Sequence, residues 1–496
     1  MKRKGTLTKR NLWSYSTGTI GRDMAASGLF IGHLLNYVLF TKALNAEQFT
    51  AVTIIMVVAR IFDAFNDPVM GNILDATHTR WGKFKPWILS GTVLTVIVIL
   101  ISFSNTLQGW GYVVLFGVMY FIFSITFTMN DISYWGMLPS LAPHPDDRNR
   151  LTSLASLMAG IGAFLCSFIA PTFTAGEYVI GGNAVTAYAV VAAMFCACML
   201  LTQLVTLVGV REAPLPEREK SGRTKVSLRV IVSTIKNNDQ TLWNAVILFI
   251  HFLVSTVGTT VSTSYLYFTF GYNGLLIMLF SILGQGASAV IFALFPSVSR
   301  RFRRAQLIRF VTVLAISGYA LLLFAGLFLP DSLGLGKFAV MAVANLFSGL
   351  GINVYYLVTM VNIANSVEYN EWKFGRRNEG IIFSVRPFVT KLGMALAQFL
   401  SMLIYMAAGV LHTTNQISDM ENSAAGGLIT LVEKTGGIEG IIAGVPDTQK
   451  LVLLLFLTLL PAAGVLTEYI IYRKKITLDE EKYEQITREI EERGRA

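Results

Sequence analysis

The 496-residue sequence is poor in charged residues, which make up 14% of it, and contains only five histidines and three cysteines. Such a low charge content excludes an ordinary soluble domain, in which about a quarter of the residues are charged. Three cysteines do not form a disulfide framework, and Cys166, Cys196 and Cys198 all fall in apolar runs where small buried side chains are expected. The sequence also lacks a metal-ligand cluster, a nucleophile elbow and a phosphate-binding loop, so nothing in it is typical of an enzyme.

Hydrophobic residues, by contrast, make up 53% of the chain, and the mean hydropathy is +0.57. A helix that crosses a membrane needs about 20 mostly apolar residues, and such runs follow one another along the sequence. Because the hydrocarbon core offers no water to backbone groups, these long runs predict helices. The sequence therefore predicts an all-α membrane protein with twelve transmembrane helices, at 14–40, 46–73, 85–104, 109–138, 150–172, 184–209, 242–268, 274–298, 306–328, 337–363, 379–409 and 449–472.

The net charge of +10 is concentrated in alternate loops, which argues against a nucleic-acid partner. By the positive-inside rule, the basic loops and both ends of the chain are expected in the cytoplasm of a cell that carries the protein in its cytoplasmic membrane. The first apolar stretch is long and contains Asp23, so we do not expect a removable signal peptide. The basic segments lie at 2–10, 80–85, 148–150, 218–236, 300–304, 373–377 and 473–475.

The longest polar break divides the predicted helices into six and six. We expect an N-terminal six-helix bundle at 1–210, a cytoplasmic linker at 211–241, a C-terminal six-helix bundle at 242–472 and a cytoplasmic tail at 473–496. Two six-helix bundles around a central cavity are the architecture of many secondary transporters. The external segment 412–450 is glycine-rich with short apolar patches, and the tail has the acid-base spacing of a solvated helix.

Four aspartates lie inside predicted spans: Asp23, Asp63, Asp67 and Asp131. A charge at the centre of a membrane helix costs at least roughly 2.5 kcal/mol, so each is a candidate functional residue. The alternative for any one of them is a satisfied helix-packing residue. Asp63 and Asp67 are four residues apart and share one helix face, with Arg60 one turn earlier. Two carboxylates this close are costly unless a cation or a proton lies between them.

The fourth predicted helix carries a second group of polar side chains on one face. Thr128, Asp131 and Trp135 follow at positions i, i+3 and i+7. A carboxylate that accepts hydroxyl groups and an aromatic ring that packs on C–H groups suit a sugar. An interfacial tryptophan is the alternative interpretation of Trp135. Lys391 places a positive charge in the eleventh helix. Asp75, Arg80 and Lys83 lie at the cytoplasmic edge and are predicted to act in gating.

Four segments of the sequence resemble one transporter family. "RIFDAFNDPVMG" followed by "RWGKFKPW", then "NDISYWGMLPSL" and "NEGIIFSVRPFVTKLG", are similar to motifs of the glycoside-pentoside-hexuronide:cation symporters, and the similarity extends over nearly the whole chain. The resemblance implies a major facilitator fold and uptake of a sugar coupled to inward sodium or proton movement. It implies a cation site at Asp63, Asn66, Asp67 and Thr128, with Asp63 and Asp67 as the sodium ligands if sodium is the ion. It implies sugar contacts at Asp23, Asp131, Trp135, Tyr356 and Lys391.

The sequence departs from the family's pattern at two points. The melibiose carrier, a member of the family, has a sugar-binding arginine in its fifth helix, where this chain has none, and a glutamine where this chain has Arg386. A gained guanidinium suits a uronate or sulfonate group on the substrate. Arg386 and Lys391 are five residues apart, about 140° around an ideal helix, so both face one cavity only if Pro387 distorts the helix.

The sequence therefore predicts a sugar:cation symporter that works by alternating access. We expect a sugar or glycoside and membrane lipid as its partners, no cofactor besides the coupling cation, no nucleic acid and no obligatory protein partner. Two alternatives stay open. A related lysolipid transporter would share the second helix but need a wider cavity, and a membrane-bound enzyme would convert a glycoside covalently.

Overall fold

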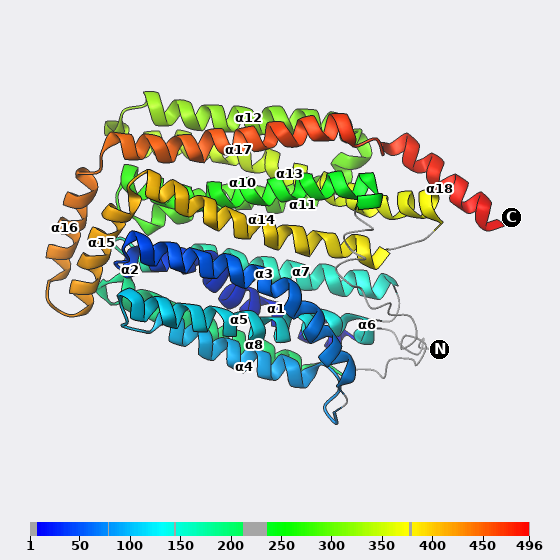
Figure 1. The fold of residues 1–496 in the computed structure, drawn as a ribbon, viewed down its shortest axis with the longest axis horizontal. Helices are drawn as coiled ribbons and strands as arrows, with labels where there is room; N and C mark the ends of the chain where they lie inside the picture. The colour runs from blue at the N-terminus through cyan, green and yellow to red at the C-terminus, as the bar shows by residue number, and fades with distance from the viewer. Residues whose placement is uncertain (1–6, 78, 143–144, 212–235, 376–378, 496) are drawn as a thin grey trace. The chain divides into compact units, whose positions relative to one another are not determined.

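The computed structural model describes residues 7–77, 79–142, 145–211, 236–375 and 379–495, with some side chains inside these ranges left undescribed. Apart from one isolated bridge between Thr79 and Gly82, the described residues form helices and their connections (Figure 1). The chain divides into two compact units. The first comprises Met1–Gly222, Gly271–Met278 and Gly409–Val445, and the second comprises Arg223–Phe270, Leu279–Ala408 and Pro446–Ala496.

The first unit contains the helices of the N-terminal part of the chain and two later ones. They are α1 (Lys9–Arg22), η1 (Asp23–His33), α2 (Leu34–Thr41), α3 (Ala46–Ala76), α4 (Lys85–Phe103), α5 (Gly109–Gly136), α6 (Leu138–Leu141), α7 (Pro145–Thr174), η2 (Ile180–Gly182), α8 (Ala184–Gly209), α15 (Val410–Ala425) and α16 (Leu431–Ala443). The second unit contains α10 (Asp239–Phe270), most of α11 (Gly274–Arg301), α12 (Arg304–Phe328), η4 (Asp331–Leu333), α13 (Leu335–Phe374), α14 (Glu379–Ala407), α17 (Asp447–Lys475) and α18 (Glu480–Arg495).

Each of the twelve predicted spans coincides with a helix. Among the described residues, ten helical segments are long and apolar enough to cross a membrane. The first of them, Lys9–Thr41, joins α1, η1 and α2 in one continuous segment. The two other predicted spans coincide with α3, of 31 residues, and α11, of 28 residues, which both include undescribed side chains. The predicted all-helical membrane fold is confirmed.

Small residues let neighbouring helices approach closely inside each unit. A side chain at Gly91 of α4 would place its Cβ atom 2.7 Å from the backbone nitrogen of Asn130 on α5. A side chain at Gly318 of α12 would place its Cβ atom 2.5 Å from the backbone nitrogen of Ser348 on α13. Small residues at such crossings are typical of membrane helices, where van der Waals contact between backbones replaces hydrophobic association.

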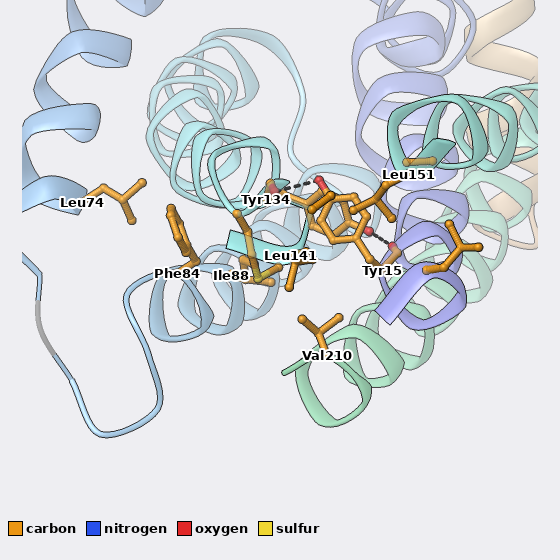
Figure 2. Packing of buried hydrophobic residues seen from close by; sticks show 12 residues of the cluster. Tyr15, Leu74, Phe84, Ile88, Tyr134, Leu141, Leu151 and Val210 are labelled. Carbon is orange, nitrogen blue, oxygen red and sulfur yellow. Dashed lines mark hydrogen bonds between the residues drawn. The ribbon is translucent and has the colours of Figure 1, made fainter. Parts of the chain in front are cut away.

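A buried cluster joins the helix ends of the first unit (Figure 2). Tyr15 of α1 and Tyr134 of α5 stack with ring centroids 4.4 Å apart. The Tyr15 hydroxyl donates to the Tyr134 carbonyl at 2.8 Å, and the Tyr134 hydroxyl donates to the Tyr15 carbonyl. Phe84, Leu141 and Val210 belong to the same cluster. Arg22 and Asp131 lie on the same two helices. Because this reciprocal pair of hydrogen bonds fixes α1 against α5, it also fixes the distance between Arg22 and Asp131.

The segment predicted as an external loop, 412–450, contains two helices. α15 and α16 form a hairpin that belongs to the first compact unit, although the hairpin follows α14 of the second unit in sequence (Figure 1). Two asparagines of α15 attach the hairpin to the first unit. Asn415 Nδ2 donates to the Leu44 carbonyl at 2.8 Å, and Asn422 Nδ2 donates to the Thr41 carbonyl at 2.9 Å.

A buried ion pair holds the two helices of this hairpin together. Glu421 of α15 is fully buried and lies 3.3 Å from Lys434 Nζ of α16. The other carboxylate oxygen of Glu421 accepts from the backbone nitrogen of Ala184, at the start of α8, at 2.6 Å. Burial raises the pKa of Glu421, and the lysine and the Ala184 N–H oppose that shift.

The tail forms the predicted helix, but it is not solvated on all sides. Ile486 of α18 and Leu478 before it are buried in a cluster with Tyr369 of α13. Glu489 accepts from Trp372 Nε1 at 2.6 Å. The acid-base spacing of the sequence predicts the helix, but it does not predict the apolar positions that pack against α13. The predicted linker lies mostly outside the described residues, at 212–235.

Two of the three cysteines, Cys166 and Cys196, are buried free thiols, as predicted, and Cys198 is half-buried.

Candidate functional site

The Arg22 guanidinium joins two of the aspartates predicted to bind substrate. Arg22 is the last residue of α1, and Asp23 is the first residue of η1, an 11-residue π-helix. Nη2 of Arg22 lies 2.8 Å from Oδ2 of Asp23, and Nη1 lies 3.1 Å from Oδ1 of Asp131 on α5. π-Helical segments are rare and often occur at functional sites. The structure thus brings Asp23 and Asp131 to one charged group.

The exposure of these side chains differs in a way that bears on ligand binding. The Arg22 side chain is 3% exposed, whereas that of Asp131 is 40% exposed. Trp135 faces the same group, with its ring centroid 5.3 Å from the guanidinium carbon. The cluster therefore offers carboxylate acceptors beside an aromatic face, on a scaffold that the buried arginine holds in place. This is the polar and aromatic combination that the spacing of Asp131 and Trp135 predicted.

A second cluster forms where α3 and α5 face each other. Asp63 is buried, and it accepts from Ser124 Oγ and lies 3.4 Å from Nη1 of Arg60. Asp67 accepts from Thr128 Oγ1 at 3.1 Å. The spacing of four residues on α3 is therefore matched by the same spacing on α5. Asn66 lies between the two acids in sequence and donates through Nδ2 to the Ser124 carbonyl at 3.5 Å.

This second cluster can hold a small cation or a proton. Two carboxylates and one guanidinium give it a formal charge of −1 when both acids are ionised. Carboxylate and hydroxyl oxygens are ligands that hard cations prefer. A proton would instead neutralise one of the two acids, which are too close to ionise together at no cost. The geometry supports both occupants equally.

The predicted substrate residues of the second unit are partly assembled. Arg386 Nη2 donates to the Tyr356 hydroxyl at 2.8 Å. Tyr356 lies on α13 and stacks on the His251 ring of α10, with centroids 5.7 Å apart. α14 continues as one helix through Pro387, and on it Arg386 is exposed while Lys391 is half-buried. The structure therefore joins Arg386 to Tyr356, and it places Lys391 further along the same helix.

A cavity of about 460 Å³ adjoins Tyr356 inside the second unit. Its lining is rich in hydroxyl and amide groups, including Ser255 and Thr259 of α10 and Asn345 and Asn353 of α13. Its volume falls in the range of small-molecule sites, about 300–1,000 Å³. The cavity is thus large enough and polar enough for a ligand that carries several hydroxyl groups.

The three predicted gating residues are less completely described. Arg80 is exposed. Lys83 is half-buried, with Nζ 5.5 Å from the Phe84 ring centroid. The side chain of Asp75 lies outside the described residues.

Sequence reasoning missed Arg22, Ser124 and His251 of these clusters, and also Glu468 of α17, which lies 3.9 Å from His251. Arg22 and Glu468 carry the same signal that singled out the aspartates, an ionisable residue inside a predicted span. Ser124 lies four residues before Thr128, so the periodicity of α5 places it on the same face. His251 carries the same signal, because it is an ionisable residue inside the predicted span 242–268, but its neighbour Glu468 is 217 positions away in sequence.

Apolar helices that span a membrane and carry charged clusters within the spans define a multi-pass membrane transporter. The particular family follows from comparison with known proteins. The chain matches the model of the family described as MFS/sugar transport protein over residues 16–462, and it belongs to that family. The resemblance predicted from the motifs is confirmed, and the protein is a transporter and not an enzyme.

Two curated relatives and one solved structure show the extent of the similarity. The chain is 29% identical over 94% of its length to the lactose permease of Lactobacillus helveticus, of which it covers 67%. It is 25% identical over 84% of its length to the glucuronide carrier protein homolog of Escherichia coli (strain K12), of which it covers 87%. The crystal structure of a D-xylose-proton symporter aligns with 89% of this chain and 98% of that chain, with a TM-score of 0.56 and 15% identity, and so shows the fold.

Proposed function

We propose that the protein carries a glycoside, oligosaccharide or hexuronide across the cytoplasmic membrane together with sodium or a proton, by alternating access between its two six-helix halves. One observation carries this proposal. Thr128 of α5 contacts Asp67 in one cluster, and Asp131 of the same helix contacts Arg22 in the other. The two residues are three positions apart, so a displacement of α5 at one cluster moves the other cluster. A single rigid helix thereby couples cation binding to sugar binding.

In this mechanism the coupling cation binds first. It is held by Asp63, Asn66, Asp67 and Thr128, where it neutralises the two acids and draws α3 and α5 together. Asp23, Asp131 and Trp135 then bind the sugar, and Tyr356, Arg386 and Lys391 are further substrate-binding residues. Coupling by this route is reciprocal, so the sugar raises the affinity for the cation by the factor by which the cation raises the affinity for the sugar.

The choice of substrate rests on the charges of the two sites. Asp131 and Trp135 suit the hydroxyl groups and the C–H face of any pyranoside. Arg386 is exposed beside Tyr356, and a guanidinium there favours a substrate that also carries a carboxylate. The relatives include a lactose permease, named for a neutral sugar, and a glucuronide carrier protein homolog, named for an anionic one. We propose a hexuronide as the preferred substrate, with neutral galactosides as weaker ones.

The orientation and the gate complete the proposal. By the positive-inside rule, the basic loops favour a cytoplasmic location for both termini. Asp75, at the end of α3, and Arg80 and Lys83, which follow α3, help to close that face when the transporter opens outward. Membrane lipid is the surrounding partner, and the mechanism requires no protein partner and no nucleic acid.

Uptake into vesicles tests this function. The purified full chain is reconstituted into liposomes, and influx of radiolabelled lactose and p-nitrophenyl β-D-glucuronide is measured under an imposed sodium gradient, an imposed proton gradient, or neither. We expect accumulation above equilibrium under one of the gradients, and loss of accumulation in Asp63→Cys and Asp67→Cys. Accumulation by both variants would refute the cation site. Competition by a lysolipid without competition by either glycoside would favour an amphiphile transporter instead.

A further inference from the structure

Glu468 is an acid inside a membrane span that the mechanism above does not use. It lies in α17, and it is 1% exposed. Neither of its carboxylate oxygens has a hydrogen bond to any residue that the structure describes. An ionised carboxylate without hydrogen bonds in such a place costs several kcal/mol. The site is therefore expected to hold a proton or a positive charge.

The imidazole of His251 lies beside this acid. Its Nδ1 atom lies 3.9 Å from Oε2 of Glu468, across the contact between α10 and α17. This separation is longer than a hydrogen bond but short enough for one rotamer change to close it. His251 also lines the cavity of about 460 Å³. The imidazole thus lies between the cavity and the buried acid.

The other polar groups around Glu468 leave its charge uncompensated. Tyr319 of α12 and Tyr355 of α13 interact electrostatically with the carboxylate, and neither is a cation. The Arg304 guanidinium of α12 contacts Glu480 and Asn362 instead. Within the described part of the chain, no lysine or arginine forms an ion pair with Glu468. A proton is the positive charge that fits this place.

We propose that His251 and Glu468 form a proton-binding site, and that the transporter carries this proton inward in addition to the cation held at Asp63 and Asp67. One proton satisfies the pair in either of two arrangements, as a neutral carboxylic acid beside a neutral imidazole or as a carboxylate beside an imidazolium. The proton enters from the water of the cavity through His251 and leaves by the same atom when the cavity faces the cytoplasm. The two cation sites belong to different compact units of the chain.

A short chain of contacts connects this proton to the substrate residues. The His251 ring stacks on Tyr356, and the Tyr356 hydroxyl accepts from Arg386. A positive charge on His251 therefore adds to that of Arg386, because both groups contact Tyr356. Protonation strengthens the binding of an anionic glycoside, and the bound anion in turn holds the proton. This link to substrate rests on the proposed function, while proton binding by the pair does not.

Proton binding is tested first, without any substrate. Infrared difference spectra of the purified full chain are recorded between acid and alkaline pH. We expect a pH-dependent signal of the pair, which is the C=O band of a protonated buried carboxyl where the carboxyl holds the proton, or the ring bands of an imidazolium where His251 holds it. This signal should disappear as the pH rises, be absent in Glu468→Gln and be unchanged in Tyr355→Phe, a control that removes a neighbouring hydroxyl. A wild-type spectrum whose bands all survive in Glu468→Gln would overturn the proposal.

A second variant keeps the test decisive if Glu468→Gln does not fold. In His251→Gln only the carboxyl of the pair can hold the proton, so a C=O band should be present and should persist to higher pH than the signal of the wild type. An unchanged titration of the band would overturn the pairing of the two residues.

Transport of the proton is tested in liposomes that contain the pH-sensitive dye pyranine. We expect p-nitrophenyl β-D-glucuronide influx through the wild type to acidify the lumen, and Glu468→Gln to retain exchange of the glycoside while losing this acidification. Acidification at the wild-type rate in Glu468→Gln would overturn the proposal. If the wild type takes up neither glycoside under any gradient, the proposed function fails, and the infrared titration alone then decides whether the pair binds a proton.

Discussion

Arg22 reaches from the end of α1 to Asp131 of α5 and lies 3.1 Å from its carboxylate, while the same guanidinium lies 2.8 Å from Asp23. The two acids proposed to bind sugar therefore share one buried cation. This arrangement holds both carboxylates in position without a ligand. It also means that a substrate hydroxyl competes with Arg22 for Asp131, whose side chain is 40% exposed.

Replacing Arg22 should destabilise the protein and abolish sugar binding. In Arg22→Gln the two carboxylates lose their cation, which we expect to cost about 1–3 kcal/mol, less than for a fully buried pair because Asp131 is partly exposed. A fall in the melting temperature of the purified protein and a loss of glycoside binding by calorimetry measure the two effects. In Arg22→Gln combined with Asp23→Asn the stability should recover while binding stays lost. An Arg22→Gln variant as stable as the wild type would contradict this role.

Removing the hydroxyl of Thr128 should weaken cation binding selectively. Thr128 Oγ1 donates to Asp67 at 3.1 Å, and hydrogen bonds to charged groups contribute about 1.5–3 kcal/mol. Thr128→Val should therefore lower the apparent cation affinity about 10-fold or more, while Thr128→Ser keeps it. The cation dependence of glycoside uptake gives this affinity. Thr126→Val is the matched control, because that hydroxyl contacts Thr95 instead. Equal losses in Thr126→Val and Thr128→Val would show a general effect on α5.

The sequence determines the helices more fully than it determines which residues meet in the two charged clusters. Apolar runs of about 20 residues predict membrane helices because the bilayer demands internal hydrogen bonding. The spacing of Asp63 and Asp67 predicts a shared face because α-helical periodicity is local. The part of Thr128 in the cation cluster is expected only from the resemblance to the symporter family, because helical spacing groups Thr128 with Asp131 and Trp135.

Contacts that depend on tertiary packing could not be read in the same way. Arg22 and Asp131 are 109 residues apart, and their contact depends on the α1 and α5 packing that Tyr15 and Tyr134 fix. The attachment of the α15 and α16 hairpin to the first unit depends on amide groups of Asn415 and Asn422, which are ordinary loop residues in the sequence. Glu468 was missed for another reason: its charge was visible, but nothing nearby in sequence indicated a partner.

Arg386 should determine whether anionic glycosides are preferred. In Arg386→Gln the charge beside Tyr356 is lost, so the affinity for p-nitrophenyl β-D-glucuronide should fall about 10-fold to 100-fold, as expected for one charge-assisted hydrogen bond. The affinity for lactose should change little, because lactose has no carboxylate. Arg386→Lys keeps the positive charge but lacks the planar guanidinium that pairs with a carboxylate. Its affinity for the glucuronide should therefore lie between those of the wild type and Arg386→Gln. Competition between the two glycosides during uptake measures the preference. Parallel losses for both would indicate that Arg386 contacts sugar hydroxyls or supports Tyr356.

The buried pair of Glu421 and Lys434 should make the hairpin sensitive to pH. Burial raises the pKa of Glu421 above its ordinary value of about 4.5, so the folded hairpin binds this proton more tightly than the opened one. Its stability should therefore be greatest at acidic pH and fall as the pH rises through the folded pKa. In Lys434→Met the carboxylate loses its cation, and opening should become easier by about 3 kcal/mol at neutral pH. Hydrogen exchange of residues 410–443 measures this opening.

Glu421→Gln is the control for this prediction, because its side-chain oxygen still accepts from the Ala184 N–H and it carries no charge. Its exchange should be independent of pH once the intrinsic amide rate is divided out, and a residual pH dependence equal to that of the wild type would assign the titration to another group.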